Sequence, residues 1–332
     1  MMRILITGGQ GQLGQALTSR YGPTQARKEV EEPKTSPQTA SPLLTGPFSP
    51  QQGMVLIPVS RHELDITQSH AIAYALETYQ PDVVINAAAY TGVDHAESEP
   101  NQAYLVNETA PGLLAQACAE QGIGMVHIST DYVFDGSSTQ PYAEDAPTNP
   151  LNIYGLSKKA GEQAVLTALP SAVVLRTSWV FSQFGNNFLK TMLRLGRVHT
   201  QLSIVSDQLG GPSYAPHIAQ VLLQLAIRLN ETKKSISRQH APCGIYHFAG
   251  EPRISWYEFA QEIFTQAVAL GLLSRAPILS PISTDHYPTP ARRPAHSSLQ
   301  QRRLDILLGQ NNIERDWKQG IRSSLVALSK SQ

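Results

Sequence analysis

The sequence predicts an α/β protein: a doubly wound parallel sheet with a smaller, partly helical lobe. Two observations carry this prediction. Short apolar runs of strand length alternate with helical patterns through the first half of the chain, and these runs are apolar on both faces. Strands of that kind are typical of a parallel sheet that helices cover on each side. The second half of the chain is less regular and predicts the lobe.

The predicted elements follow in chain order. We expect strands at residues 4–7, 55–59, 83–87, 125–129, 172–177 and 244–248. We expect helices at residues 12–21, 103–121, 154–169, 217–229, 255–272 and 313–328. Ser255, with Glu258 three residues later, forms a capping box that marks the start of one helix. The prolines of residues 277–294 predict an irregular loop.

Two segments interrupt the alternation. Residues 22–53 contain six prolines among Ser, Thr and Gln, with almost no periodic apolar pattern. Burial cannot offset the ordering entropy of such a segment, so we expect a flexible surface loop. Residues 230–242 predict a second, shorter surface insertion.

The bulk composition excludes several classes of function. The 26 Lys and Arg residues balance 26 Asp and Glu, which argues against nucleic acid or an acidic membrane surface as a main partner. No apolar run is long enough to span a bilayer, and the chain does not start like a signal peptide. Cys118 and Cys243 lack metal-ligand spacing, so we expect reduced core thiols and no metal site. A cytoplasmic protein that acts on a small molecule, as a monomer or homodimer, fits best.

The first predicted strand leads into a glycine-rich turn. Gly8, Gly11 and Gly14 stand between this strand and the helix that follows. Glycines at these places permit a tight turn and let the backbone approach a pyrophosphate at the helix N-terminus. The strand–turn–helix context is that of a Rossmann fold, so we predict a dinucleotide site.

The end of the second strand indicates which dinucleotide is used. Ser60 and Arg61 stand where an acidic residue would hold the ribose hydroxyls of NAD. A guanidinium suits a 2′-phosphate, so the sequence predicts NADPH, with acceptance of NADH left open. Ala87, Ala88 and Ala89 end the third strand, and their small side chains leave room for the cofactor.

These motifs divide the chain into two parts. Residues 1–182 are predicted to form a dinucleotide-binding Rossmann domain, and residues 183–332 mainly a substrate-binding lobe. Residues 201–229 and 244–249 are expected to return to the main sheet.

Tyr154 and Lys158 lie four residues apart at the start of a predicted helix, so their side chains share one face. A carbonyl that is reduced takes a hydride on carbon and a proton on oxygen, and Tyr154 would supply the proton. A nearby ammonium favours the phenolate, so we expect Lys158 to lower the pKa of Tyr154. Thr130 and Asp131 end a strand at the cofactor edge, where a hydroxyl can orient a ketone oxygen. A local turn, capped by Asp131, is the simpler interpretation of these two residues.

Together these motifs resemble the dTDP-4-dehydrorhamnose reductase family, a branch of the extended short-chain dehydrogenases/reductases. The resemblance covers nearly the whole chain outside residues 22–53. It rests on NAAAYTGVDHAE at 86–97, STDYVFDG at 129–136, YGLSKKAGE at 154–162, RTSWVF at 176–181, NNFLKTML at 186–193, DQLG at 207–210 and YPTPARRP at 287–294.

The resemblance implies NADPH-dependent reduction of the 4-keto group of dTDP-4-dehydro-L-rhamnose to dTDP-L-rhamnose, with Thr130, Tyr154 and Lys158 as the catalytic triad. Implied cofactor contacts are Gly11, Gln12, Leu13, Asp65, Ile66, Ala89, Tyr90 and Thr91. Expected substrate contacts are Thr91, Val93, Thr130, Asp131, Tyr154 and Trp179. A contact between Arg293 and the substrate diphosphate is inferred from charge alone.

Magnesium does not carry over with the resemblance. Some members of the family hold this ion at a dimer contact, through a glutamate of the first helix. Gln15 and Ala16 occupy that region here, and neither is a carboxylate.

Two other functions stay open. A sugar-nucleotide dehydratase would call for a second acid after Asp131, where this chain has Tyr132; an epimerase would retain NAD, which Arg61 does not favour. The chain also resembles the regulatory subunit of methionine adenosyltransferase, which binds a nicotinamide cofactor without catalysis. The intact Tyr154 and Lys158 favour a catalyst.

Overall fold

The computed structural model describes residues 1–21, 53–234 and 242–330. The surface loop predicted over 22–53 lies outside these residues, apart from Gly53. The shorter insertion predicted over 230–242 lies partly outside them, and its first residues continue a helix.

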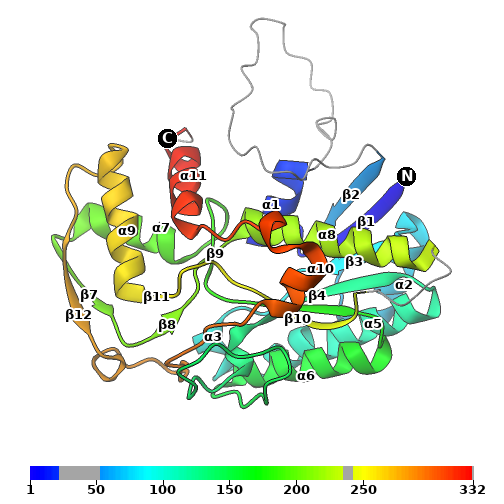
Figure 1. Ribbon diagram of the computed structural model, residues 1–332. Helices are drawn as coiled ribbons and strands as arrows, with labels where there is room; N and C mark the ends of the chain where they lie inside the picture. The colour runs from blue at the N-terminus through cyan, green and yellow to red at the C-terminus, as the bar shows by residue number, and fades with distance from the viewer. Residues whose placement is uncertain (22–52, 235–241, 331–332) are drawn as a thin grey trace, which may run out of the picture.

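The main sheet has six parallel strands, and it confirms the doubly wound α/β fold. The strands lie in the order β10-β5-β4-β3-β1-β2 (Figure 1). Their bounds are β1 Met2–Thr7, β2 Met54–Val59, β3 Val83–Asn86, β4 Gly124–Thr130, β5 Val173–Thr177 and β10 Gly244–Phe248. The order reverses between β1 and β3, so the loops after these two strands open a crevice at the carboxyl edge, where such sheets bind ligands.

Helices cover both faces of this sheet because its strands are apolar on both faces. Ile4 and Ile6 of β1 belong to the core on one face and Leu5 to the core on the other. In Figure 1, α8 lies above the sheet and α5 and α6 lie below it. The helices of this domain are α1 Gln12–Tyr21, α2 Ser69–Tyr79, α3 Val93–Ala96, α4 Pro100–Tyr104, α5 Ala110–Glu120, α6 Ile153–Ala168, α8 Ala215–Lys234 and α10 Arg302–Leu308.

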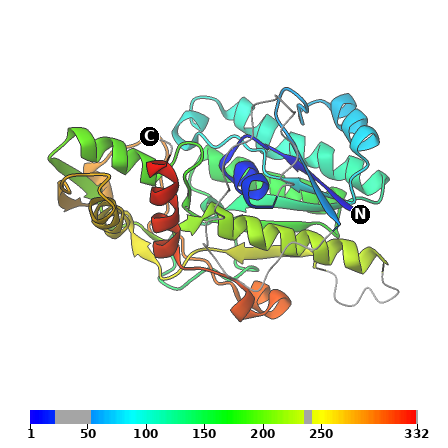
Figure 2. The ribbon, with the colours of Figure 1, turned by 90° about the horizontal axis from the view of Figure 1, so that it is seen from above.

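The smaller lobe has its own apolar core beside the sheet (Figure 2). Three helices enclose this core, with Phe181, Phe259 and Trp317 among the buried aromatic residues. The helices are α7 Phe188–Val198, α9 Trp256–Ala269 and α11 Trp317–Ser329. The remaining strands are β6 Val180–Phe181, β7 Gln201–Val205, β8 Leu209–Gly210, β9 Ser213–Tyr214, β11 Ile254–Ser255 and β12 Ile278–Ile282. The predicted capping box of Ser255 and Glu258 is present at the start of α9.

Some elements differ from the sequence expectations. β7 pairs with β12 in the smaller lobe, although residues 201–229 were expected to return to the main sheet; within that range, α8 packs on the sheet. The irregular loop predicted over 277–294 is wrong for residues 278–282, which form β12. Proline is tolerated there because β12 has one partner strand, so Pro281 needs no second ladder bond.

The helix expected at 103–121 is broken into α4, a π-helical turn Leu105–Thr109 and α5. Short 3₁₀ turns lie at Asp131–Val133, Thr284–His286 and Gln310–Asn312. Cys118 is buried, but Cys243 is exposed, so the prediction of two core thiols is wrong for Cys243. Within the described residues, no helix has the length and apolar character needed to cross a membrane.

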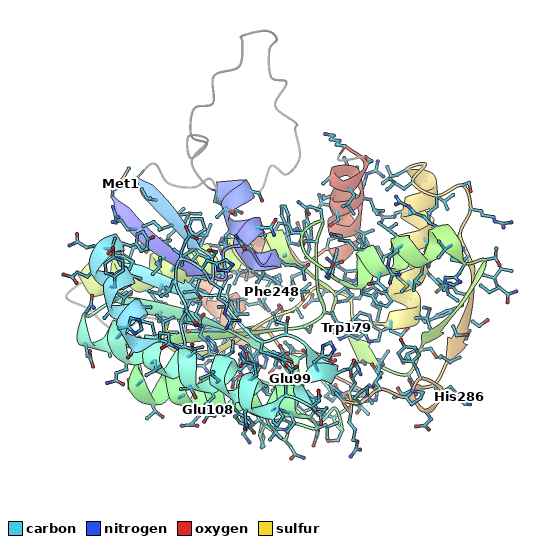
Figure 3. All side chains as sticks on the ribbon, turned by 180° about the vertical axis from the view of Figure 1, so that it is seen from behind. Met1, Glu99, Glu108, Trp179, Phe248 and His286 are labelled. Carbon is cyan, nitrogen blue, oxygen red and sulfur yellow. The ribbon has the colours of Figure 1, made fainter. Side chains whose placement is uncertain are left out.

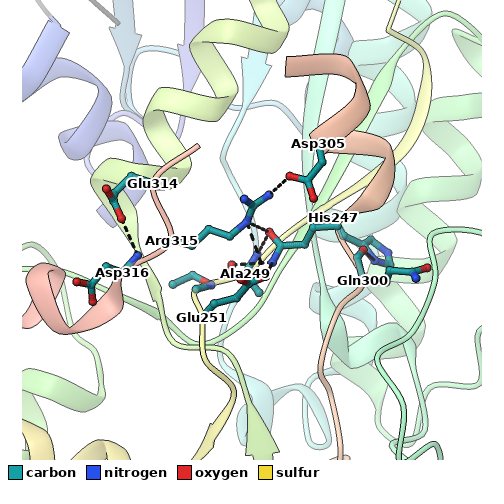
Figure 4. Close-up of polar contacts among 11 residues, drawn as sticks. His247, Ala249, Glu251, Gln300, Asp305, Glu314, Arg315 and Asp316 are labelled. Carbon is teal, nitrogen blue, oxygen red and sulfur yellow. Dashed lines mark hydrogen bonds and ion pairs between the residues drawn. The ribbon is translucent and has the colours of Figure 1, made fainter. Parts of the chain in front are cut away.

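Polar contacts tie residues 300–316 back onto the end of β10 (Figure 4). Arg315 donates from Nη2 to Asp305 Oδ1 at 2.5 Å and from Nε to Gln301 Oε1 at 2.9 Å. Gln301 in turn exchanges two hydrogen bonds with the backbone of Ala249. This cluster fixes the path of the chain as it leaves the sheet edge.

Candidate active site

The glycine-rich loop after β1 is shaped by close backbone contacts. Gly8 has φ +68°, and a Cβ on it would lie 2.8 Å from the backbone nitrogen of Ala88. A Cβ on Gly14 would lie 2.5 Å from the carbonyl oxygen of Gly8. Helix α1 therefore begins directly against the loop, with its amide groups turned toward the crevice between β1 and β3. This cradle fits a pyrophosphate approached by backbone N–H groups.

Two residues of this loop were expected to contact the cofactor, and their side chains point elsewhere. Gln12 Oε1 accepts hydrogen bonds from Ser182 Oγ at 3.0 Å and Asn187 Nδ2 at 2.9 Å, at the start of the smaller lobe. Leu13 is buried in the core beneath α1. The Gln12 side chain is therefore committed to the smaller lobe and the Leu13 side chain to the core.

The end of β2 leaves Arg61 exposed at the surface. The nearest carboxylate, that of Glu63, already has a hydrogen-bond partner. It accepts a hydrogen bond from the Ser60 backbone N–H at 2.7 Å, and that bond lowers the pKa of Glu63. Asp65 accepts from both the backbone and the hydroxyl of Thr67, and these bonds lower its pKa. Both carboxylates are therefore used in local turns, and Ile66 is buried.

The loop after β3 carries Ala87, Ala88 and Ala89, all half-buried, followed by Tyr90 and Thr91. Its position is held by a residue that the sequence analysis did not single out. Asn107 accepts from the Tyr90 backbone N–H at 2.9 Å and donates to the Tyr90 carbonyl at 3.0 Å.

Asn107 also reaches helix α6, which carries Tyr154 and Lys158, because its Nδ2 donates to Ser157 Oγ at 3.0 Å. It is buried inside the π-helical turn. The sequence offered one signal for this role. Asn107 is a polar residue inside the helix predicted over 103–121, and a polar side chain that is buried there needs a hydrogen-bond partner.

Tyr154, Lys158 and Thr130 come together at the carboxyl edge of the sheet. Asn152 caps helix α6, its Oδ1 accepting from the Gly155 N–H at 2.7 Å. Thr130 is the last residue of β4, and its hydroxyl lies close enough to Tyr154 to act on the pKa of that phenol. Gly155 lets the helix approach closely, since a Cβ there would collide with the Tyr132 carbonyl.

Burial dominates the electrostatics of this group. It raises the pKa of Tyr154 to about 12, against the effect of the Thr130 hydrogen bond. It lowers the pKa of Lys158 to about 8, against the attraction of Glu162. The expectation that Lys158 lowers the pKa of Tyr154 is therefore wrong for this state: the Lys158 Nζ donates instead to the Ile128 carbonyl at 2.6 Å. Tyr154 is a neutral phenol at neutral pH, which is the form that can donate a proton.

Asp131 lies buried beside this group and accepts from the Thr130 hydroxyl at 3.0 Å. Burial raises its pKa to about 6, although hydrogen bonds with Ser297 and Thr130 oppose that shift. The side chain is therefore buried against the Thr130 hydroxyl and is not a solvent-exposed cap.

Trp179 lies between the two lobes (Figure 3). Its indole stacks on Trp256 of the smaller lobe, with ring centroids 3.5 Å apart and planes 6° apart. Its backbone has φ +45°, in the left-handed region that non-glycine residues seldom adopt. Gly210 is required beside it, because a Cβ there would lie 2.6 Å from the indole. The ring is thus held rigidly at the boundary of the lobes.

Arg293 was expected at a substrate diphosphate, and its guanidinium is already engaged. It pairs with Asp94, with Nη2 2.8 Å from Oδ2 and Nη1 3.1 Å from Oδ1. Val93, another expected substrate contact, is half-buried at the start of α3 beside Asp94. Arg292 is exposed.

A buried ion pair lies behind the catalytic helix, and the sequence analysis missed it. Arg176 of β5 donates to both oxygens of Glu162, at 2.8 and 2.7 Å. Glu162 also accepts from Ser129 Oγ at 2.5 Å. Because Ser129 precedes Thr130 and Glu162 lies one turn after Lys158, the pair fixes the helix against the strand. No pattern in the sequence pairs these two residues, which come from separate elements.

Comparisons with known proteins agree with this geometry. Residues 44–330 match the family described as the RmlD substrate binding domain. The chain is 41% identical to a dTDP-4-dehydrorhamnose reductase of Aggregatibacter actinomycetemcomitans, over 97% of this chain and 98% of that protein. It is 37% identical to the Salmonella typhimurium protein of the same name, over 85% of this chain and 92% of that protein.

Solved structures agree as well. A dTDP-4-dehydrorhamnose reductase from Clostridium acetobutylicum superposes with a TM-score of 0.80 at 33% identity, covering 99% of this chain and all of that one. The Bacillus anthracis enzyme, solved in complex with NADP, also gives 0.80, at 30% identity, covering 98% of this chain and all of that one. The chain therefore belongs to the dTDP-4-dehydrorhamnose reductase family.

Proposed function

We propose that this protein reduces the 4-keto group of dTDP-4-dehydro-L-rhamnose with NADPH, giving dTDP-L-rhamnose as the last step of dTDP-rhamnose biosynthesis. One observation carries the proposal: the neutral hydroxyl of Tyr154 lies beside Thr130 and one helical turn from Lys158, at the edge where the dinucleotide cradle opens. The names of the relatives support the same reaction.

The chain's own residues have distinct tasks in this reaction. Bound NADPH would supply the hydride that reaches the substrate C4. The Tyr154 hydroxyl donates its proton to the ketone oxygen as that bond forms, so the carbonyl becomes an alcohol. Thr130 orients the oxygen, and the Lys158 ammonium stabilises the phenolate that remains.

The proposed contacts follow the geometry. Backbone groups of Gly8, Gly11 and Gly14, with Gln12 and Leu13, cradle the cofactor diphosphate. The loop from Ala87 to Thr91 lies toward the nicotinamide, and the loop from Ser60 to Ile66 toward the adenosine. We place the sugar between Thr130, Asp131, Tyr154 and Trp179, with Thr91 and Val93 at the mouth.

We propose a preference for NADPH over NADH. Arg61 is exposed at the end of β2 while the nearest carboxylate, Glu63, is bonded to Ser60. An exposed guanidinium attracts a 2′-phosphate, while Glu63 and Asp65, the acids near it, accept hydrogen bonds from their own turns. The NADP complex of the Bacillus anthracis relative supports this choice. We also propose that the protein acts in the cytoplasm, on a dTDP-sugar and with no nucleic acid or membrane partner.

The deciding experiment follows the loss of nicotinamide absorbance with the keto-sugar generated in situ. We expect turnover with NADPH and weaker turnover with NADH. Tyr154→Phe should lower turnover by roughly 100-fold or more, because the proton donor is lost, while NADPH still binds. Tyr104→Phe in α4 is the control and should keep its activity.

Two results would overturn the proposal. Near-normal turnover by Tyr154→Phe would remove the proposed proton donor. NADPH binding without turnover of the wild type would favour another keto-sugar, or a regulatory role such as that of the methionine adenosyltransferase subunit. Tightly held NAD in the purified protein would favour an epimerase.

A further inference from the structure

Residues 289–294, which we call the strap, run across the boundary between the two lobes. Before the strap, the Thr284 hydroxyl and N–H both donate to Asp207. After it, the Ala295 carbonyl accepts from the Leu209 N–H at 2.7 Å. The strap itself is fixed by contacts with the cofactor-binding domain.

One carboxylate holds the strap on that side. Asp94 of α3 accepts two hydrogen bonds from Arg293 and a third from the Ala291 N–H at 3.2 Å. The two side chains are 39% and 22% exposed, so the pair is partly shielded from water. Burial opposes the ionisation of Asp94, but the bonds from Arg293 and Ala291 outweigh it and lower its pKa.

Arg293 also shapes the strap internally. Its Nη1 donates to Thr289 Oγ1 at 2.5 Å and to the Ala291 carbonyl at 3.2 Å. A guanidinium has five N–H donors, and the Tyr132 side chain lies near enough to this one to raise the pKa of Arg293. Most of its hydrogen-bonding capacity is therefore committed within the protein.

The strap is connected to the catalytic helix. Asn152 Nδ2 donates to the Arg292 carbonyl at 2.7 Å, while Asn152 Oδ1 accepts from the Gly155 N–H. The same buried side chain thus caps α6 and binds the strap, two residues before Tyr154. Any shift of the strap at Arg292 would act on the helix terminus that orients this tyrosine.

Tyr132 gives a second connection. Its ring packs edge-on against Tyr154, with centroids 5.5 Å apart and an interplanar angle of 75°. Its side chain also contacts Arg293, as noted. Tyr132 therefore lies between the strap and the catalytic tyrosine.

We propose that Asp94 and Arg293 form a latch that holds the strap against the catalytic helix, with Arg293 as a positioning residue and not a ligand of the substrate diphosphate. The latch fixes Asn152 and Tyr132, and through them the direction of the Tyr154 hydroxyl. The inference rests on the proposed reductase activity only for its kinetic readout.

The experiment compares Arg293→Met, Asp94→Asn, the double variant, and the reversed pair Asp94→Arg with Arg293→Asp. Arg292→Met is the matched control, since the Arg292 side chain is exposed and only its backbone binds Asn152. We measure kcat, the KM for the keto-sugar, the NADPH dissociation constant, and hydrogen exchange of residues 289–300 without ligand.

The latch predicts that both single variants lower kcat roughly tenfold, because the proton donor is misplaced. Substrate KM and NADPH affinity should stay within about twofold, and the double variant should be no worse than either single one. The reversed pair should recover part of kcat, and the control should match the wild type. Exchange protection of the strap should fall in both single variants.

A different pattern would overturn the latch. If Arg293→Met raises the substrate KM while Asp94→Asn leaves kcat and KM unchanged, Arg293 is a diphosphate ligand. Unchanged strap protection in both single variants would also refute it. If the wild type shows no turnover, the proposed function fails, and the exchange measurement alone decides the latch.

Discussion

Lys158 sets the pH range of the site at the scale of single residues. Its side chain is 2% exposed, and burial lowers its pKa to about 8. Tyr154 has the opposite shift, to about 12, and stays protonated across the physiological range. Of these two residues, Lys158 is therefore the first to lose its proton as the pH rises above neutral.

We predict that kcat/KM falls as the pH rises through about 8, because Lys158 then loses the charge that stabilises the phenolate of Tyr154. A guanidinium keeps its proton, so Lys158→Arg should move this fall to higher pH even if its maximal rate is lower. The pH profile of kcat/KM measures both. A profile for Lys158→Arg with an unchanged upper limit would show that another group titrates.

The same shift affects stability, with a definite sign. Lys158 is neutral in the folded chain and charged in the unfolded chain between pH 8 and its ordinary pKa of 10.5. The unfolded state then binds more protons, so this residue makes stability rise with pH across that window. Above pH 8, we therefore expect activity to fall while the contribution of Lys158 to stability rises.

Which side chains meet could be predicted only where the partners are local or share a strand edge. Tyr154 and Lys158 are one helical turn apart, and Thr130 ends a neighbouring strand, so their meeting follows from periodicity and sheet topology. The partners of Gln12 and Arg293 lie up to 175 and 199 residues away. The directions in which the Gln12 and Arg293 side chains point depend on tertiary packing, which no local sequence pattern contains. The sequence therefore predicted ligand contacts for both side chains.

At the scale of elements, the contact of α6 with the π-helical turn places the catalytic helix. Gly161 of α6 faces the Asn107 carbonyl so closely that a Cβ would collide with it. The π-helical turn moves that carbonyl out of the regular helical path, and Asn107 binds the loop after β3 and Ser157 as a result. This interface therefore sets the position of the loop after β3 relative to Tyr154 and Lys158 of α6.

We predict that Gly161→Ala lowers the free energy of unfolding by about 2 kcal/mol and lowers kcat, since the new methyl group must push α6 away from the π-helical turn. Gly112→Ala in α5 is the control. Its Cβ would lie 3.2 Å from the Ala164 Cβ, a mild contact that the gain in helix propensity of up to about 1 kcal/mol can offset. Urea unfolding and steady-state kinetics measure both. Equal stability of the two variants would contradict the close approach.

Periodicity predicted the strands of the main sheet and most of its helices because each buries an apolar face. It did not predict α2, although its buried residues Ile72, Ala75 and Leu76 stand at helical spacing, or the break at Leu105–Thr109. It also missed β12, since the prolines around Ile278–Ile282 are typical of loops. Elements held by one partner strand or by a single side chain leave little periodic signal.

At the scale of the whole molecule, two buried histidines make the fold sensitive to acid. Burial lowers the pKa of His247 to about 3 and that of His127 well below its ordinary value. His127 hydrogen-bonds Asn86, and His247 contacts Arg176 and the Gln300 carbonyl. Both are neutral in the folded chain and become charged on unfolding in acid.

We predict that the free energy of unfolding decreases as the pH falls below 6.5, by about 1.4 kcal/mol per pH unit for each histidine, until the folded-state pKa is reached. Asp131 opposes this between pH 6 and 3.8, since its raised pKa makes the folded state bind the additional proton. Urea unfolding across pH 4 to 7 measures the slope, and His247→Gln should flatten it by one proton. An unchanged slope in that variant would exclude His247 as a source.

The strap also determines when the chain can first become active during its synthesis. Five strands of the main sheet and the whole of α6 are complete by Thr177. The hydrogen-bond partners of Asn152 and Asp94, however, lie 140 and 199 residues further along the chain. A ribosome must therefore deliver the chain as far as Arg293 before the last contacts around Tyr154 can close. A nascent chain can fold its nucleotide cradle early, yet the surroundings of Tyr154 stay incomplete until the strap has been synthesised.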